Sequence, residues 1–68
     1  MLPDLKEIPR RRRKVCLTQS RFAKEAGISR SMLAKIERGY ANPSYGQAKK
    51  IFETLDRLEE AMTKKTRF

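Results

Sequence analysis

The sequence has 68 residues, with 17 Lys and Arg against 8 Asp and Glu, and its formal net charge is +9. It holds no His and 1 Cys, so it lacks the commonest general base and forms neither an intramolecular disulfide nor a cysteine-cluster zinc site. This length allows one small domain, which argues against most enzymes, and the charge favours a polyanionic partner.

The chain begins with signals for two short helices. Pro9 suits the first position of a helix, where its missing N–H costs nothing, and predicts an Arg-rich helix over residues 9–15. Thr18 is a candidate N-cap for a second helix over residues 18–26, because its hydroxyl can accept from an N–H of the first turn. Gly27 should end this helix, since the position after a helix favours the left-handed conformation.

A third helix over residues 30–38 is predicted to follow at once. Ser29 caps it and Gly39 ends it. Two helices joined by a short turn that contains glycine are typical of a helix-turn-helix. The positions expected to face inward in this pair are apolar: Phe22, Ala23, Ala26, Ile28, Leu33 and Ile36.

The fourth predicted helix is the longest and covers residues 44–63. Ser44 and Gln47 form a capping box at its start. Apolar residues then recur in steps of three and four, which indicates one core-facing stripe. The stripe consists of Tyr45, Ala48, Ile51, Phe52, Leu55, Leu58 and Met62. No segment alternates between apolar and polar residues, so the sequence predicts an all-α fold.

Many positions match one family in register. They include Leu17-Thr18-Gln19, Ala23, Gly27-Ile28-Ser29, Ile36-Glu37-Arg38-Gly39 and Asn42-Pro43-Ser44. Over about residues 8–55 the chain therefore resembles the Cro/C1-type (XRE) helix-turn-helix family, and it is most similar to archaeal-type members. The resemblance implies a small four- to five-helix, lambda-repressor-like DNA-binding domain. We expect a single domain over residues 1–68, with helices four and five merged and a helical extension at 56–63.

The resemblance also implies that the third helix, residues 29–38, lies in the major groove of double-stranded DNA. Arg30 and Lys35 would donate hydrogen bonds to guanine, and Ala34 would touch a thymine methyl. Ser31 would enter the groove beside the arginine. These four side chains are the predicted base contacts.

Contacts to the DNA backbone are implied around this helix. Gln19 matches a family glutamine that contacts the backbone and supports the recognition helix, and Arg12 matches an arginine that pairs with an acid, here Glu37. The chain departs from the family at Arg11, where an apolar residue is usual, and at Cys16, which replaces a glycine and is expected to be half-buried. The predicted backbone contacts are Gln19, Arg38, Asn42, Tyr40, Arg12, Arg11, Ser29 and Lys24. The basic run at 10–14 faces the backbone or forms a solvated surface.

The apolar stripe of the fourth helix continues past the end of a four-helix module. Leu55 marks that end, and Leu58 and Met62 lie beyond it. We expect these residues to form the seam of a homodimer, which would present two recognition helices about 34 Å apart to an inverted repeat. The alternative is a tail that covers the module's own edge.

The sequence thus predicts a sequence-specific double-stranded DNA-binding transcriptional regulator, with no enzyme activity, metal or cofactor. One alternative is a protein-interaction module of the same fold, of antitoxin or bridging-factor type, with DNA binding secondary. Another is a nucleic-acid binder that uses charge alone. No apolar run exceeds three residues, so no membrane span is expected, and the lone cysteine fits a cytoplasmic, nucleoid-associated protein.

Overall fold

The structure is a computed structural model that describes residues 4–65, with side chains described up to residue 63. It contains the helices α1 (Glu7–Lys14), α2 (Gln19–Ala26), α3 (Arg30–Arg38) and α4 (Tyr45–Lys65), and no strand in the described part of the chain. The all-α prediction is confirmed. The prediction of one long last helix is also confirmed, because α4 runs unbroken for 21 residues.

Three helices begin at side-chain caps that the sequence predicts. The hydroxyls of Thr18 and Ser29 accept from backbone N–H groups three residues further on, at 3.2 and 3.0 Å. Ser44 and Gln47 form a reciprocal capping box, in which each side chain accepts from the other residue's backbone N–H at 3.1 Å. These bonds satisfy N–H groups that the first turn of a helix leaves without an intrahelical acceptor.

Left-handed residues allow the tight turns between the first three helices and at the end of α3. Gly27 follows α2 at φ 74° and Gly39 follows α3 at φ 82°, as the sequence predicts. Cys16, between α1 and α2, has φ 61°, a value that costs a residue with a Cβ more than it costs glycine. The position where the resembled family has glycine is therefore left-handed here too. Cys16 is exposed, and the prediction of a half-buried cysteine is wrong.

The first helix differs from the predicted one at both ends. α1 begins at Glu7 and ends at Lys14, whereas the sequence predicts residues 9–15. A turn precedes it, in which the carbonyl of Asp4 accepts from the N–H of Glu7 at 3.0 Å. Pro9 is consequently the third residue of the helix, where its missing N–H still removes no intrahelical hydrogen bond.

The core forms where the inner faces of the four helices come together. Its fully buried side chains come from all four helices: Ile8, Phe22, Leu33, Ile36, Ile51 and Leu55. Burial of this apolar surface is the main stabilising contribution in a small domain. Ile28, which was also predicted to face inward, is half-buried against the cluster.

Two predictions for the apolar stripe of α4 are wrong. Tyr45 is 70% exposed at the first position of α4, three residues before Ala48, where the buried part of the stripe begins. Leu55 is 0% exposed, so it packs inside its own module and is not available to a dimer seam.

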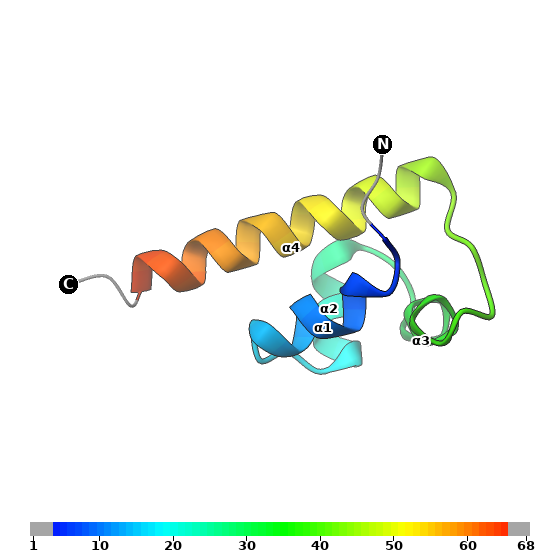
Figure 1. Cartoon of the computed structure of the whole chain (residues 1–68), viewed down its shortest axis with the longest axis horizontal. Coiled ribbons are helices and arrows are strands. Elements are labelled where there is room, and N and C mark those ends of the chain that lie inside the picture. The colour runs from blue at the N-terminus through cyan, green and yellow to red at the C-terminus, as the bar shows by residue number, and fades with distance from the viewer. Residues whose placement is uncertain (1–3, 66–68) are drawn as a thin grey trace.

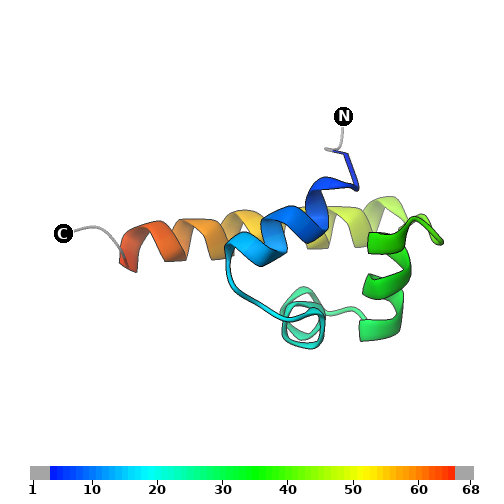
Figure 2. The same cartoon turned by 60° about the horizontal axis from the view of Figure 1, so that its bottom comes forward.

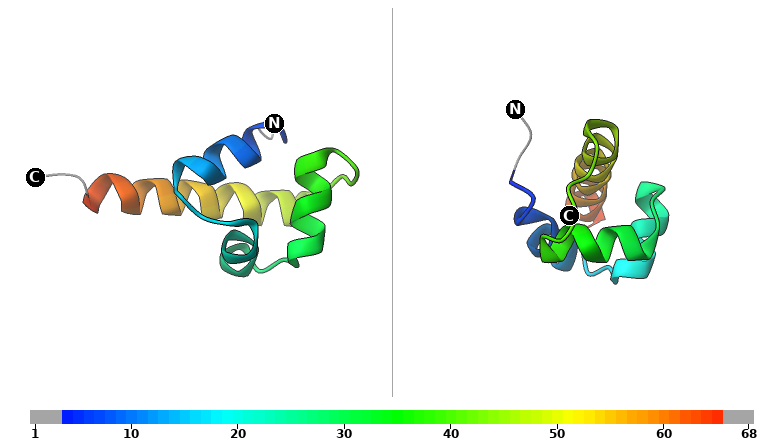
Figure 3. Two further views of the ribbon diagram at one scale, coloured as in Figure 1. Left: turned by 90° about the horizontal axis from the view of Figure 1, so that it is seen from below. Right: turned by 90° about the vertical axis from the view of Figure 1, so that its right-hand side faces the viewer.

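The two ends of the molecule are formed by different helices. α1 and α2 both pack against α4: α1 runs obliquely beside it, and α2 crosses it (Figures 1 and 2). α3 packs against α2 and lies crosswise to it at one end of the molecule (Figures 2 and 3). The C-terminal turns of α4 project past the other helices at the opposite end (Figure 1). None of the described helices is both long enough and apolar enough to cross a membrane.

Candidate nucleic-acid interface

The third helix has a buried face and an exposed face. Leu33 and Ile36, three residues apart, are 0% and 2% exposed and hold α3 on the core. The side chains predicted to contact bases are turned away from this core: Arg30, Ser31 and Lys35 are exposed and Ala34 is half-buried. Helical spacing places them on one side of α3, together with the exposed Arg38.

The exposed face of α3 carries positive charge that no acid neutralises among the described residues. Arg30, Lys35 and Arg38 form no ion pair there. Glu37, the acid of this helix, turns into a buried ion pair instead, and Glu25 on α2 is held by two other arginines. Uncompensated cations gathered on one exposed face attract a polyanion.

A buried hydrogen-bond network ties α1 and α2 to the end of α3. Nε and Nη2 of Arg12 donate to the two carboxylate oxygens of Glu37 at 2.7 and 3.0 Å, and its Nη1 donates to the carbonyl of Leu17 at 2.8 Å. Nε2 of Gln19 donates to Oε1 of Glu37 at 2.9 Å. The expected pair of Arg12 and Glu37 is therefore present, and its side chains are only 10% and 5% exposed.

This network holds Glu37 in its ionised form. Burial raises the pKa of the carboxyl, but the hydrogen bonds from Arg12 and Gln19 and the nearby positive charges outweigh it, so the pKa lies below its ordinary value. The guanidinium of Arg12 is engaged inside the molecule, and the residue is 8% exposed. The structure thus assigns Arg12 to fixing α3 in place, rather than to the DNA-backbone contact predicted for it.

Gln19 lies between the buried network and the surface. Its side chain is half-buried. Because an ionised carboxylate only accepts hydrogen bonds, the amide nitrogen of Gln19 must be the atom that faces Glu37. The amide keeps a second N–H and its carbonyl oxygen for another partner.

Most of the other predicted backbone contacts lie around the exposed face of α3. Arg38, Tyr40 and Asn42 are exposed at the end of the helix and in the loop after it, and Tyr40 is 78% exposed. Ser29 and Lys24 are exposed at the start of α3 and on α2. The hydroxyl of Ser29 also caps α3.

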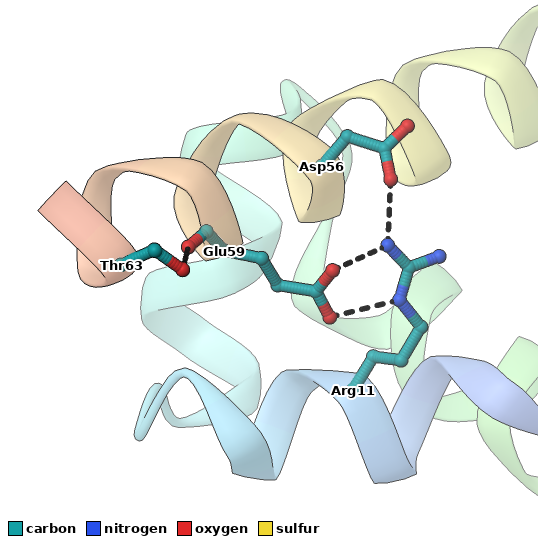
Figure 4. Close-up of polar contacts among 4 residues, drawn as sticks. All are labelled: Arg11, Asp56, Glu59 and Thr63. Atoms are coloured by element: carbon teal, nitrogen blue, oxygen red, sulfur yellow. Dashed lines mark hydrogen bonds and ion pairs between the residues drawn. The ribbon is translucent and has the colours of Figure 1, made fainter.

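Arg11 lies apart from this surface, and its predicted contact with DNA is corrected. Its Nε and Nη2 donate to the carboxylate of Glu59 at 2.9 and 2.8 Å, and Nη2 also donates to Asp56 at 2.6 Å (Figure 4). These hydrogen bonds outweigh burial and keep the pKa of Glu59 below its ordinary value. The arginine at the usually apolar position therefore joins α1 to α4.

The end of α4 forms one side of a shallow apolar groove. Leu58 is half-buried against the core, and Met62 is 39% exposed. The groove measures about 220 Å³ and is lined by Val15, Cys16, Leu17, Leu58, Ala61 and Met62. The described residues contain no cluster of Cys, Asp or Glu that would hold a metal ion.

Comparison with protein-family models gives a match over most of the chain. A family model described as helix-turn-helix matches residues 10–61, which takes in all of α2 and α3 and most of α1 and α4. Neither the curated proteins nor the solved structures contain a significant match to the chain.

Proposed function

Because the chain belongs to the helix-turn-helix family of the Cro/C1 (XRE) type, we propose that it is a sequence-specific transcriptional regulator that reads double-stranded DNA with α3. The observation that carries the proposal is the division of α3 into two faces. One face is anchored by buried apolar side chains and an ion pair, and the other presents cations without acid partners among the described residues. A helix held in this way can enter the major groove without rearranging.

Base readout falls to the exposed side of α3. Arg30 stands at the start of the helix, where recognition helices contact base edges, and can donate two hydrogen bonds to guanine. Lys35, just over one turn further on, supplies a second donor, and Ser31 lies on the same side. Ala34 offers a methyl group to thymine.

Phosphate contacts provide most of the affinity in this proposal. Gln19 has an amide N–H left after its bond to Glu37, and Arg38, Tyr40 and Asn42 are exposed past the end of α3. Ser29 and Lys24 add to this set at the start of α3 and on α2. Each phosphate that the protein neutralises should contribute about 0.9 to the salt dependence of binding. We place this activity at nucleoid DNA in the cytoplasm, and the similarity to archaeal-type members stays a prediction.

We further propose that two copies pair through the end of α4. This end projects past the other helices (Figure 1), and Leu58 and Met62 line an apolar groove on it. Pairing would set two recognition helices about 34 Å apart, to match an inverted repeat. The same groove favours a second candidate function, in which a different protein docks there and DNA binding is secondary.

Selection of binding sites from a random duplex DNA pool tests the proposal. At about 150 mM salt, where nonspecific binding is weak, the wild-type protein should enrich an inverted repeat. The double variant Arg30→Ala/Lys35→Ala should lose this enrichment. Arg57→Ala is the matched control, because it removes a cation of α4 whose ion pair with Glu25 is exposed.

Each outcome of the selection has a distinct meaning. A single enriched half-site would support readout by α3 and overturn the dimer. Equal binding to all sequences would overturn specific readout and would favour a nucleic-acid binder that uses charge alone. If the double variant enriches the same DNA sequence as the wild-type protein, α3 does not read the bases.

A further inference from the structure

The basic residues at the end of α1 stand on different sides of the helix. Ile8 and Arg12, four residues apart, are both buried and mark its inner side. Because successive residues are rotated by about 100°, Arg11 and Arg13 lie on opposite flanks of Arg12. Lys14, three residues after Arg11, lies on the Arg11 flank.

The Arg11 flank faces the acidic side chains of α4. Arg11 is paired with Glu59 and Asp56, as described above. Lys14 lines a groove with the same acids. Hydrogen bonds from Arg11 are the main cause of the lowered pKa of Glu59, and the charge of Lys14 adds to them. The cations of this flank are therefore compensated within the molecule.

The opposite flank, which carries Arg13, is turned away from the acids that Arg11 contacts on α4. Between the two flanks, Arg12 reaches Glu37 on α3. Arg13 follows Arg12 directly, and its carbonyl accepts from the N–H of Cys16 at 2.9 Å in the turn that leads to α2. Burial raises the pKa of Glu37, hydrogen bonds from Arg12 and Gln19 lower it, and the charge of Arg13 adds to the lowering. Both oxygens of Glu37 are already bonded to Arg12 and Gln19. Arg13 is exposed and forms no ion pair within the described residues.

We propose that Arg13 contacts a DNA phosphate beside the start of α2 and is the cation of α1 that fixes the position of α3 on the duplex. The inference rests on the proposed function. It singles out Arg13 from the basic run at 10–14, because the run alone does not show which of its residues contacts DNA. Gln19 offers an amide N–H at the start of α2, and Arg12 neutralises the carboxylate to which this amide is bonded, so a phosphate there meets no net repulsion from Glu37. The planar fork of an arginine suits a phosphate because it can donate two parallel hydrogen bonds.

Matched variants on the two flanks of α1 test this role. The probe is the duplex that the wild-type protein enriches, beside a scrambled duplex of equal length. Arg13→Ala should weaken binding to both by a similar factor of roughly ten, and should lower the slope of log affinity against log salt by about 0.9. Lys14→Ala removes the same charge from the other flank and should keep both quantities near wild type. Arg13→Lys should restore the slope, which a purely structural role would not do.

Failure of this inference is distinguishable from failure of the proposed function. If the wild-type protein binds no duplex, both fall. If it binds and Arg13→Ala keeps the wild-type salt slope, only the role of Arg13 is overturned. Equal losses in Arg13→Ala and Lys14→Ala also overturn it, because they would show a general effect of net charge. Arg13→Gln, a second uncharged variant of this exposed position, should reproduce the slope of Arg13→Ala and so exclude an effect of folding.

Discussion

The two faces of α3 hold charge in opposite ways. On the inner face Glu37 meets Arg12, and neither side chain is more than 10% exposed. On the outer face Arg30 and Lys35 are exposed, and no acid within the described residues pairs with them. A buried charge depends on its partner, whereas an exposed cation is stable in water and available to a ligand. Side chains of the same chemistry therefore differ in their surroundings: Arg12 holds the helix in place, and Arg30 is exposed on the face that we propose contacts DNA.

Removal of the inner cation should have the largest effect. Arg12→Ala leaves Glu37 buried without its main partner, and breaking a buried pair in this way costs about 3–5 kcal/mol. A domain of this size has little more stability than that. We therefore expect Arg12→Ala to be largely unfolded at 37 °C, as measured by the helical circular dichroism signal on heating and in urea.

Arg10→Ala is the matched control for this substitution. Arg10 lies on the same helix, is exposed and forms no ion pair in the described part of the chain. Its removal should leave the unfolding midpoint nearly unchanged. Equal midpoints for the two variants would show that the buried pair contributes no more than a surface charge, and the distinction between the two faces would be lost.

Removal of the outer cation should affect binding but not folding. Arg30→Ala should cost about 1–3 kcal/mol in binding to the selected duplex and relax the preference at one base position. Its unfolding midpoint should match that of the wild type, because Arg30 has no partner to lose among the described residues. Fluorescence anisotropy titrations against duplexes with single base changes measure the preference. A loss that is uniform over all sequences would reassign Arg30 to the DNA backbone.

Lowering the pH should weaken the buried pair of Arg12 and Glu37 before it affects the cations on the outer face of α3. The pKa of Glu37 lies below its ordinary value in the folded protein, so its contribution to stability is complete above the unfolded pKa of about 4.3 and is lost as the pH falls through the folded pKa. The wild-type unfolding midpoint should therefore fall steeply below about pH 4.3. Glu37→Gln should be less stable at neutral pH and should show a shallower fall. Glu53→Gln, at an exposed position of α4, should run parallel to the wild type.

Local signals in the sequence predicted the fold well. The hydroxyls of Thr18 and Ser29 and the capping box at Ser44 act within one turn of chain, so a reading of neighbouring residues is sufficient. The pair of Arg12 and Glu37 spans two helices, and it was expected only because the chain resembles a known family.

Predictions that depend on the packing of distant helices were less accurate. Arg11 was assigned to DNA as part of the basic run at 10–14. Its partners, Asp56 and Glu59, lie 45 and 48 residues away in sequence. Nothing in the local pattern shows that α1 and α4 lie side by side with these groups opposed. Tyr45 continues the apolar spacing of α4, but its side chain is 70% exposed. Periodicity identifies a face, and only the tertiary structure shows how far the face is covered.

A substitution in the turn between α1 and α2 should have the smallest effect on stability. Cys16 lies between Arg12 and Gln19 at φ 61°, and the left-handed conformation costs a residue with a Cβ about 1–2 kcal/mol. Glycine removes this cost but loses more entropy on folding, by about 0.5–1 kcal/mol. Cys16→Gly should therefore stabilise the protein by about 1 kcal/mol, which corresponds to a rise of about 4–8 °C in the unfolding midpoint of a domain this small.

Cys16→Ala separates the effect of the backbone from that of the thiol. Alanine keeps the Cβ, so this variant should retain the strain and unfold near the wild-type midpoint when both are heated with a reductant. If alanine stabilises as much as glycine does, the gain comes from loss of the thiol and the turn is not strained. Neither variant should change the preference for bases, because Cys16 lies in the turn between α1 and α2 and not on the exposed face of α3. A change in preference would show that the turn transmits its conformation to the outer face, so that the two faces of α3 do not act independently.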